Sequence, residues 1–454
     1  MTAVFAESAI SAASAQTPNA EAAQAEISAL REEMEDLRAD YEARIEAMEA
    51  RLKRAEEAAA IPPGAVAGPT PAPDTAAAAA PIGTPVAVAQ IAQQAASVPA
   101  NTYNPGISVV LNGGFAAYES NPDTARIPGF PLDEEAGLDP EGFSLGESEV
   151  VLNANIDHVL YGNLILAFDG EGDVGVEEAY IQTTKLPGGF TAKAGKLFSG
   201  IGYLNEKHSH YWDFIDAPLP YRAFLGVQYG DPGVQLRWIA PTDFYLEFGG
   251  EWFRGDSFPA AGAAKNGRGT AAGFVQTGGD IGASSSWLAK FSYLRARADE
   301  RETPLGSLFT GTDSLGIVSG VFKWAPQGNP VRRNLIVNGE YFFGREKGEF
   351  DGTAINLNRS GWYAQGVYQF RPRWRIGARY ASIGSEGAPI ALLGSEIDDL
   401  GRSPNATSAL LEYDTSEFGR FRLMYTLDDS DALSNNEFFA RYTVTFGPHG
   451  AHRF

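Results

Sequence analysis

From about residue 105 to the C-terminus, apolar and polar residues alternate with a period of two. In the last such stretch, "NNEFFARYTVTF", Phe438, Tyr442 and Phe446 lie on one face, and Glu437 and Thr443 lie on the other. Successive side chains of a strand point to opposite faces, so this stretch predicts a strand with an aromatic face and a polar face. The same alternation recurs in "ESEVVLNANID", "LIVNGEYFF", "RWRIGARY" and "FRLMYT". A soluble sandwich would also alternate, but its apolar face would be mostly aliphatic.

The connections between these strands alternate between short and long. Short connections include "LPGG", "APTD" and "RPR". Long or polar connections are expected at 119–142, 198–230, 255–269, 297–313, 346–358 and 386–405. About sixteen strands of roughly ten residues, separated in this way, are typical of a transmembrane β-barrel. In a closed barrel every backbone polar group is paired and lipid lies against the aromatic face. We therefore predict an all-β transmembrane barrel of antiparallel strands over residues 103–454.

The residues that precede the barrel predict three different segments. Residues 1–20 are rich in small residues, and they are either a flexible N-terminus or the remnant of a signal peptide. Residues 21–59 carry Ile27, Leu30, Met34 and Leu37 at heptad spacing, which predicts an α-helical coiled coil with one stutter. Residues 60–102 are dominated by Ala and Pro and predict a linker.

The apolar stripe of the predicted coiled coil is narrow. A single helix with such a stripe is marginal in water, so partner helices are expected and the protein is predicted to be a homo-oligomer. The alternative is that the helix packs against the rest of its own chain.

Composition and motifs exclude several classes of protein. The chain has no Cys, so it has no disulfides, thiolate chemistry or Cys-based zinc sites. Its formal net charge of -22 argues against nucleic-acid binding. There is no G-x-S-x-G, no Gly-rich phosphate loop and no H-E-x-x-H, so we do not predict an enzyme. A barrel with a Ser/His/Asp set at its rim is kept as a minor alternative.

The chain resembles bacterial outer-membrane porins. A last strand that alternates up to a terminal Phe454 resembles the assembly signal of outer-membrane barrels, and residues 105–454 as a whole resemble a sixteen-stranded porin. With a coiled coil in front, the chain resembles the phosphate-selective porin O and P family. This resemblance implies passive diffusion of small polar or charged solutes, a trimer, and contacts with outer-membrane lipid and the barrel assembly machinery. It also implies that the coiled coil and linker lie in the periplasm, where they would additionally tether the barrel toward the cell wall.

The third external loop is predicted to constrict the pore. In trimeric porins this loop folds inward, and here it has the sequence "SGIGYLNEKHSHYWDFIDAPLPYRAFLG". The predicted constriction combines residues of the loop with residues that project inward from the walls: Glu206, Lys207, Asp213, Asp216, Arg222, Glu247, Glu251, Arg373, Arg375, Arg379, Arg422 and Arg441. Basic residues on one wall opposite acidic residues on the loop would create a transverse field. The alternatives are a loop packed on a neighbouring subunit, and inward Arg side chains that only hydrate the lumen and pair with inward Glu.

The same loop holds a candidate zinc site. His208 and His210 form an H-x-H motif with Asp213 nearby, and imidazole and carboxylate groups bind Zn²⁺. The motif is short, so chance proximity is the alternative. Residues 202–222 also resemble a set of outer-membrane proteins that are linked by name to zinc regulation. An uptake barrel for zinc is therefore the alternative function, and no other cofactor is predicted.

The terminal Phe gives the first testable prediction. Phe454→Ala removes the aromatic end of the predicted assembly signal, so we expect less protein in the outer membrane and an unchanged pore. The measurement is the surface level of the variant beside that of the parent, with single-channel conductance of the inserted fraction as the control. Equal surface levels would contradict the prediction.

Overall fold

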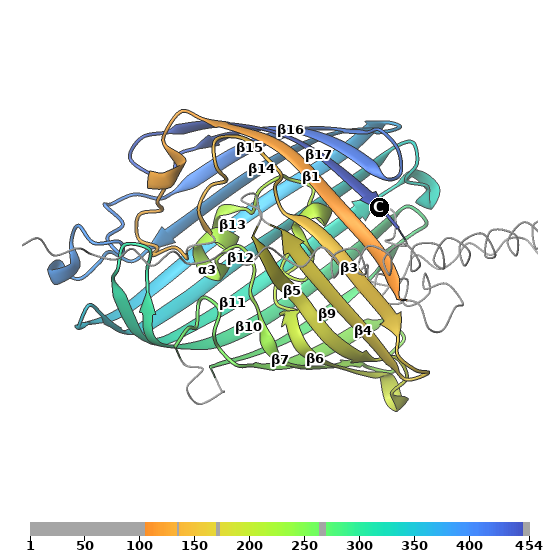
Figure 1. Cartoon of the computed structure of the whole chain (residues 1–454), viewed down its shortest axis with the longest axis horizontal. Coiled ribbons are helices and arrows are strands. Elements are labelled where there is room, and N and C mark those ends of the chain that lie inside the picture. The colour runs from red at the N-terminus through yellow and green to blue at the C-terminus, as the bar shows by residue number, and fades with distance from the viewer. Residues whose placement is uncertain (1–104, 134–135, 169–172, 263–268, 448–454) are drawn as a thin grey trace, which may run out of the picture. The chain divides into compact units, whose positions relative to one another are not determined.

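The computed structural model describes residues 105–133, 136–168, 173–262 and 269–447. They form one antiparallel sheet that closes into a barrel, because β1 pairs with β17 on one side and with β2 and β3 on the other (Figure 1). β2 and β3 pair with successive parts of β1, so together they occupy one of sixteen positions in the wall. The predicted sixteen-stranded barrel is confirmed. The predicted segments 1–20, 21–59 and 60–102, and the terminal Phe454, lie outside the described residues.

The wall is built from strands of very different length. Their bounds are β1 Gly106–Tyr118, β2 Gly142–Ser144, β3 Ser148–Asn155, β4 Leu160–Phe168, β5 Val174–Thr183, β6 Phe190–Phe198, β7 Gly230–Ile239, β8 Tyr245–Phe253, β9 Thr270–Ile281, β10 Ser285–Glu302, β11 Leu308–Trp324, β12 Asn334–Phe350, β13 Thr353–Arg371, β14 Trp374–Ser385, β15 Asn405–Asp414, β16 Gly419–Asp428 and β17 Asn435–Phe446. Helical segments are short: the α-helix α3 Leu219–Leu225 and the 3₁₀ turns η1 Pro122–Thr124, η3 Pro187–Gly189, η4 Ser209–Tyr211, η6 Pro326–Gly328 and η7 Ile390–Leu392. None of the helices that the structure describes is long and apolar enough to cross a bilayer.

The exposure of side chains follows the predicted alternation. On β12, Val337, Tyr341 and Phe343 are 40%, 48% and 42% exposed, whereas Asn338 and Glu340 are each 3% exposed. Because the outer face of a membrane barrel meets lipid, exposed aromatic side chains on that face are expected. The polar residues of the same strand point into the lumen and are buried there.

Two of the connections predicted to be long are strands instead. β10 and β11 stay paired up to Glu302 and Leu308, and β12 and β13 stay paired up to Phe350 and Thr353. Only residues 303–307 and 351–352 form the turns. The prediction was wrong at 297–313 and 346–358 because these strands carry charged residues on both faces near their ends, where apolar alternation no longer marks a strand. The long connections at 119–142, 198–230 and 386–405 are present.

The apolar core of the molecule lies inside the barrel. It joins Leu315 of β11, Phe342 of β12 and Tyr363 of β13 to Tyr221 and Phe224 of α3. The Tyr221 ring packs edge-on against the Phe342 ring, and the Phe224 ring stacks on it at 5.7 Å between ring centres. A barrel of this size leaves room for such a segment within it. The segment that fills this space belongs to the connection between β6 and β7.

Candidate functional site: loop 3 inside the barrel

Loop 3, which we define as residues 199–229 between β6 and β7, lies within the ring of strands (Figure 1). Its helix α3 begins with Pro220 in the first turn and ends at Gly226, whose φ of 59° suits glycine. Every residue of α3 is buried, which is incompatible with a helix on the outer surface. The expectation that this loop folds inward is therefore confirmed.

Arginine side chains of β14 hold one side of loop 3. Arg375 donates hydrogen bonds to Asp213 at 2.7 Å and to Glu412 at 2.9 Å, and Arg379 pairs with Asp216. Burial raises the pKa of Asp213, but the charge of Arg375 outweighs it and holds that pKa below its usual range. A buried guanidinium requires several acceptors, and loop 3 supplies part of them.

Strands β16 and β17 also hold the loop, through its main-chain carbonyl oxygens. Arg422 of β16 donates to the carbonyl oxygen of Trp212 at 2.9 Å, and Arg441 of β17 donates to that of Ile215 at 3.1 Å. Arg420, which the sequence analysis did not select, also donates to the Trp212 oxygen at 3.2 Å. These arginines thus fix the path of the loop backbone.

A single carboxylate of β12, two strands from β14 in the ring, also holds the loop. Glu340 of β12 accepts hydrogen bonds from the Tyr203 backbone N–H at 2.6 Å and from the Tyr221 hydroxyl at 2.6 Å. It also accepts from Tyr363 of β13 at 2.7 Å. Glu340 was recognised as an inward polar residue of its strand but was not assigned to the constriction. Its role depends on contacts with residues of loop 3 that are far from it in the sequence, which no local pattern encodes.

Strands β7, β8 and β10 supply a second buried charge network beside the loop. Glu206 of loop 3 pairs with Arg237 of β7 and lies 3.6 Å from the Nζ of Lys290 of β10. Arg237 also lies 3.3 Å from Glu247 of β8, a predicted residue. Arg237 and Lys290 were not among the predicted constriction residues.

Three further residues of the predicted constriction, one from the wall and two from the loop, are also in contact with their surroundings. Glu251 of β8 accepts from the Gly200 backbone N–H at 2.7 Å. The Nζ of Lys207 lies 3.1 Å from the centre of the Tyr203 ring. Arg222 of α3 donates to a carbonyl oxygen of the segment that follows β1, at 3.1 Å.

The structure corrects two parts of the predicted constriction. Arg373 lies in the turn between β13 and β14 with a φ of 70°, is exposed, and donates to the carbonyl oxygen of Thr415 at 3.3 Å. It is outside the constriction because β14 begins one residue later. The loop acids Asp213 and Asp216 contact the wall arginines directly, so these opposite charges do not face each other across an open gap.

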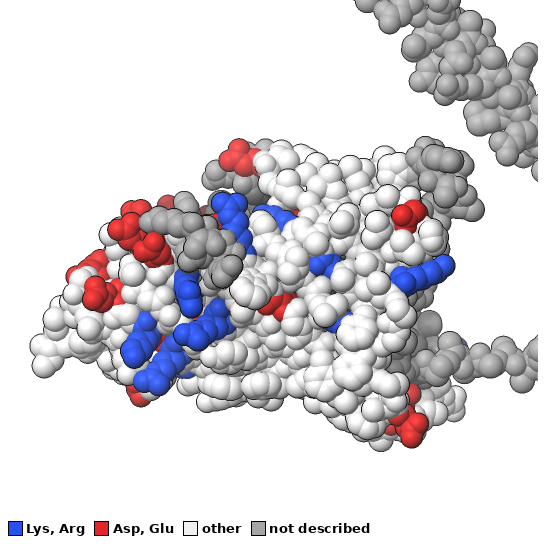
Figure 2. All heavy atoms as spheres, turned by 90° about the horizontal axis from the view of Figure 1, so that it is seen from below, with Lys and Arg blue, Asp and Glu red and all other residues white. Residues whose placement is uncertain are grey.

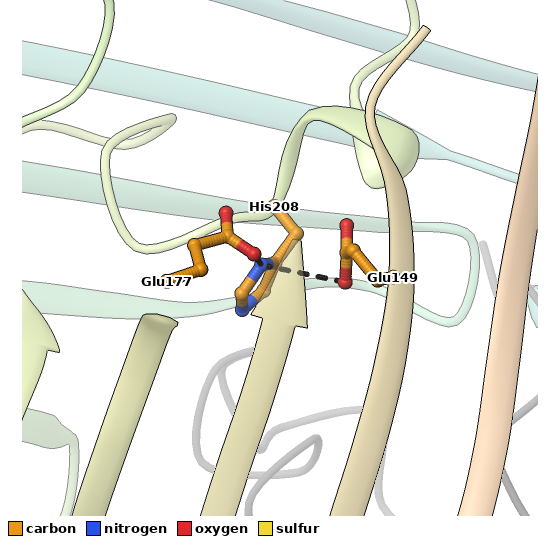
Figure 3. A group of neighbouring side chains, drawn as sticks. All are labelled: Glu149, Glu177 and His208. Carbon is orange, nitrogen blue, oxygen red and sulfur yellow. Dashed lines mark ion pairs between the residues drawn. The ribbon is translucent and has the colours of Figure 1, made fainter. Parts of the chain in front are cut away.

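A buried His/Glu cluster joins loop 3 to β3 and β5. The Nδ1 of His208 lies 3.0 Å from Glu177 Oε2 and 3.7 Å from Glu149 Oε2, and these three residues surround a common point (Figure 3). The Nε2 of His208 lies 3.1 Å from Glu178, and the Nδ1 of His210 lies 2.6 Å from Glu149 Oε1. Asp213, the predicted third ligand, belongs instead to the pair with Arg375.

A β-bulge brings both adjacent glutamates into this cluster. Ile165 of β4 pairs with Glu178, but Leu166 pairs with Val176, so Glu177 is the extra residue on β5. A bulge places two successive residues opposite one partner and re-aims a side chain. Strict alternation would send one of the two carboxylates outward, which is why sequence analysis did not assign them to the loop.

The cluster carries more acidic than basic groups. Ser209 donates to Glu147 at 2.6 Å, and burial together with Glu177 and Glu149 raises the pKa of Glu147 to about 8. Burial alone lowers the pKa of His208, but the carboxylates of Glu177 and Glu149 outweigh it and raise that pKa well above its usual value. This surplus of negative charge favours a bound cation.

The comparisons with known proteins agree with this architecture. No protein-family model matches the chain. A protein of Aquifex aeolicus (strain VF5), described only as uncharacterized, is 31% identical over 389 residues, which are 77% of this chain and 80% of that protein. The chain belongs to the same family as this Aquifex protein.

Three solved outer-membrane proteins are similar in fold. A loop L8 deletion mutant of OmpT of Vibrio cholerae has a TM-score of 0.50 at 14% identity, covering 76% of this chain and 99% of that chain. In-vitro folded OmpT of Vibrio cholerae in a trimer form has a TM-score of 0.49 at 12% identity, covering 76% of this chain and 99% of that chain. The outer-membrane channel DcaP of Acinetobacter baumannii has a TM-score of 0.47 at 9% identity, covering 75% of this chain and 97% of that chain. The fold is that of an outer-membrane β-barrel, and the resemblances to porins O and P and to zinc-regulated proteins are not confirmed.

Glu340 gives a prediction about the rigidity of loop 3. Glu340→Ala removes an acceptor shared by the loop and the wall, and each hydrogen bond to a charged group contributes roughly 1.5–3 kcal/mol. We expect hydrogen exchange in residues 202–221 to be at least about tenfold faster, since about 1.4 kcal/mol corresponds to a factor of ten. Glu349→Ala on the exposed face of the same strand is the control. Equal exchange in both variants would contradict the anchoring role.

Proposed function

We propose that this protein is a diffusion channel of the bacterial outer membrane for small polar or charged solutes, with loop 3 limiting the passage. The observation that carries the proposal is the anchoring of loop 3 to opposite sides of the lumen, by Arg375 and Arg379 of β14 on one side and by Arg237 of β7, which pairs with Glu206, on the other. A loop fixed in this way narrows the pore at the height of the loop. Passage then depends on size and on the charges that line the remaining space.

The paired charges determine the expected selectivity. Asp213 and Asp216 neutralise Arg375 and Arg379 by direct contact. Removal of either partner leaves the other charge buried in a region of low dielectric, where it acts on a passing ion more strongly than in water. The channel should therefore respond strongly to changes in these pairs and weakly to changes in outer turns.

Reversal potentials in a salt gradient test this selectivity. Asp213→Asn with Asp216→Asn should shift the potential toward anions, and Arg375→Gln with Arg379→Gln should shift it toward cations. We expect severalfold changes in the permeability ratio, measured in planar bilayers. Glu302→Gln, in an exposed position at the end of β10, is the matched control for charge. If all variants select like the parent, the ion path does not pass these pairs.

The His/Glu cluster favours a second function, the binding of a divalent cation such as Zn²⁺. Ligand atoms of Glu149, Glu177 and His208 all lie within 4.8 Å of one another. Bonds of about 2.1 Å in a tetrahedral site separate the ligand atoms by roughly 3.4 Å, and the distances from His208 to Glu177 and Glu149 are 3.0 and 3.7 Å. Two carboxylates and a neutral imidazole would balance the charge of the ion.

Residues around these ligands support the assignment. Glu178 contacts the other ring nitrogen of His208, and His210 contacts the second oxygen of Glu149. Partners of this kind orient metal ligands and raise their basicity. A cation held here would join loop 3 to β3 and β5, so its binding is expected to alter the conductance of the channel.

Calorimetric titration of the purified protein with Zn²⁺ tests the metal site. We expect one ion per chain, and His208→Ala or Glu177→Gln should weaken binding at least tenfold because each removes a ligand. Asp213→Asn should leave the affinity unchanged, since Asp213 is not a ligand in this arrangement. His158→Ala, in an exposed turn, is the control. Loss of affinity with Asp213→Asn but not with Glu177→Gln would favour the ligand set suggested by sequence alone.

Assembly remains part of the proposal. We propose a homo-trimer whose coiled coil and linker lie in the periplasm, with lipid and the assembly machinery as partners. Pairing of Val109 with Phe446 places both ends of the described barrel at the same rim, which is consistent with this orientation. The tethering of the barrel toward the cell wall by residues 21–102 also stays a prediction.

A further inference from the structure

Four basic side chains gather on the outer surface of the barrel, at the end that carries loop 3. Arg295 and Arg297 of β10 and Arg345 and Lys347 of β12 are all exposed and all lie on the outward face of their strands. Figure 2 shows Lys and Arg gathered toward one end of this side of the barrel, with Asp and Glu also at that end, whereas much of the rest of the face is uncharged. We name these four residues the outward cation cluster.

The strand register sets the spacing of the cluster and places hydroxyl groups within it. Across β10, β11 and β12 the facing residues are Arg295 with Ser314, Ser314 with Arg345, Arg297 with Thr312, and Thr312 with Lys347. Neighbouring strands lie about 4.8 Å apart and alternate residues of one strand about 6.8 Å apart. The four cations therefore occupy a rectangle of roughly 10 by 7 Å, with Ser314 and Thr312 between them.

The positive charges of the outward cation cluster are not neutralised by ion pairs with described carboxylates. In the part of the chain that the structure describes, no carboxylate lies within ion-pair distance of Arg295, Arg297 or Lys347, and the Nε of Arg345 donates to Asn356 at 2.8 Å. Glu386 lies at the edge of the cluster, where it accepts hydrogen bonds from Asn358. An excess of donors and positive charge thus remains on an outward face of a protein whose net charge is -22.

An outer groove lies directly beside the cluster on its membrane side. The groove has a volume of about 580 Å³, and its lining combines aromatic residues on one side with polar residues on the other: Tyr293, Phe343, Arg345, Asn358 and Glu386. A Cβ at Gly316 would lie 2.2 Å from the Phe343 ring, so only glycine allows this ring to lie flat across β11. Tyr293 and Phe343 are 45% and 42% exposed. Aromatic side chains of this kind mark the boundary between hydrocarbon and headgroups, so the cations lie at headgroup level.

We infer that the outward cation cluster binds the phosphate headgroup of a lipid in the external leaflet, with the groove beside Tyr293 and Phe343 receiving the start of its acyl chains. Arginine donates in a fork that matches phosphate oxygens, and Ser314 and Thr312 add hydroxyl donors. The order along the strands, aromatic and then cationic, matches the order of acyl chain and phosphate in such a lipid. The continuation of β10 to β13 as strands beyond the aromatic belt places these side chains in two aligned rows.

Native mass spectrometry of the full-length protein in an uncharged detergent tests this inference, with a bisphosphorylated lipid A as the probe. We expect the parent to retain the lipid, and Arg295→Gln with Arg345→Gln to weaken retention at least tenfold. Arg332→Gln with Arg333→Gln is the control, because it removes the same charge from the exposed turn between β11 and β12 at the other rim. The fully dephosphorylated lipid should bind the parent at least tenfold more weakly than the phosphorylated one.

Two results would overturn the inference. One is equal retention by the parent and the Arg295/Arg345 variant, and the other is equal retention of phosphorylated and dephosphorylated lipid by the parent. The thermal unfolding of each variant identifies a folding defect. If the double variant unfolds early, Arg297→Gln with Lys347→Gln takes its place, since it removes the other row of the same cluster.

Discussion

The interaction on which the rest of this structure depends is the contact between loop 3 and charged side chains that point inward from the wall. Buried arginines and glutamates are costly unless their hydrogen-bonding groups find partners. Loop 3 supplies those partners, as the carboxylates of Asp213 and Asp216, as carbonyl oxygens near Trp212, and as hydroxyl and N–H groups toward Glu340. Neither the loop nor these wall residues would be stable in their present state without the other.

This dependence explains why the lumen contains an apolar core and a charged layer at once. Helix α3 packs its aromatic residues against β12 and β13, which fixes the height of the loop in the barrel. With the height fixed, the first part of the loop meets the glutamates of β3, β5 and β8. The His/Glu cluster is the part of this layer in which carboxylates outnumber cations, and it is therefore the part suited to a metal ion.

The side chains of the outer face differ from those of the lumen, because the outer face is in contact with lipid. Strands β10 to β13 alternate through the aromatic belt and then continue with basic residues on the same face. One sheet thus provides a packed, charge-paired interior and, on the outer face of β10 and β12, basic side chains without a carboxylate partner among the described residues. The two faces support separate proposals, a diffusion channel within and a lipid site outside, and either can stand without the other.

The sequence alone determined the barrel, because period-two alternation with an aromatic face is stable only against lipid and only in a closed sheet. It also determined that the loop at 198–230 is unusual and that residues such as Arg375, Arg379 and Arg441 point inward. Tertiary structure decided which groups meet. Glu149 and Glu177 join His208 because a bulge in β5 and the path of loop 3 bring them together, although they are far apart along the chain. Arg373 was misplaced and Glu340 was missed for the same reason: alternation gives the side of a strand, whereas contacts depend on strand ends and on what crosses the lumen.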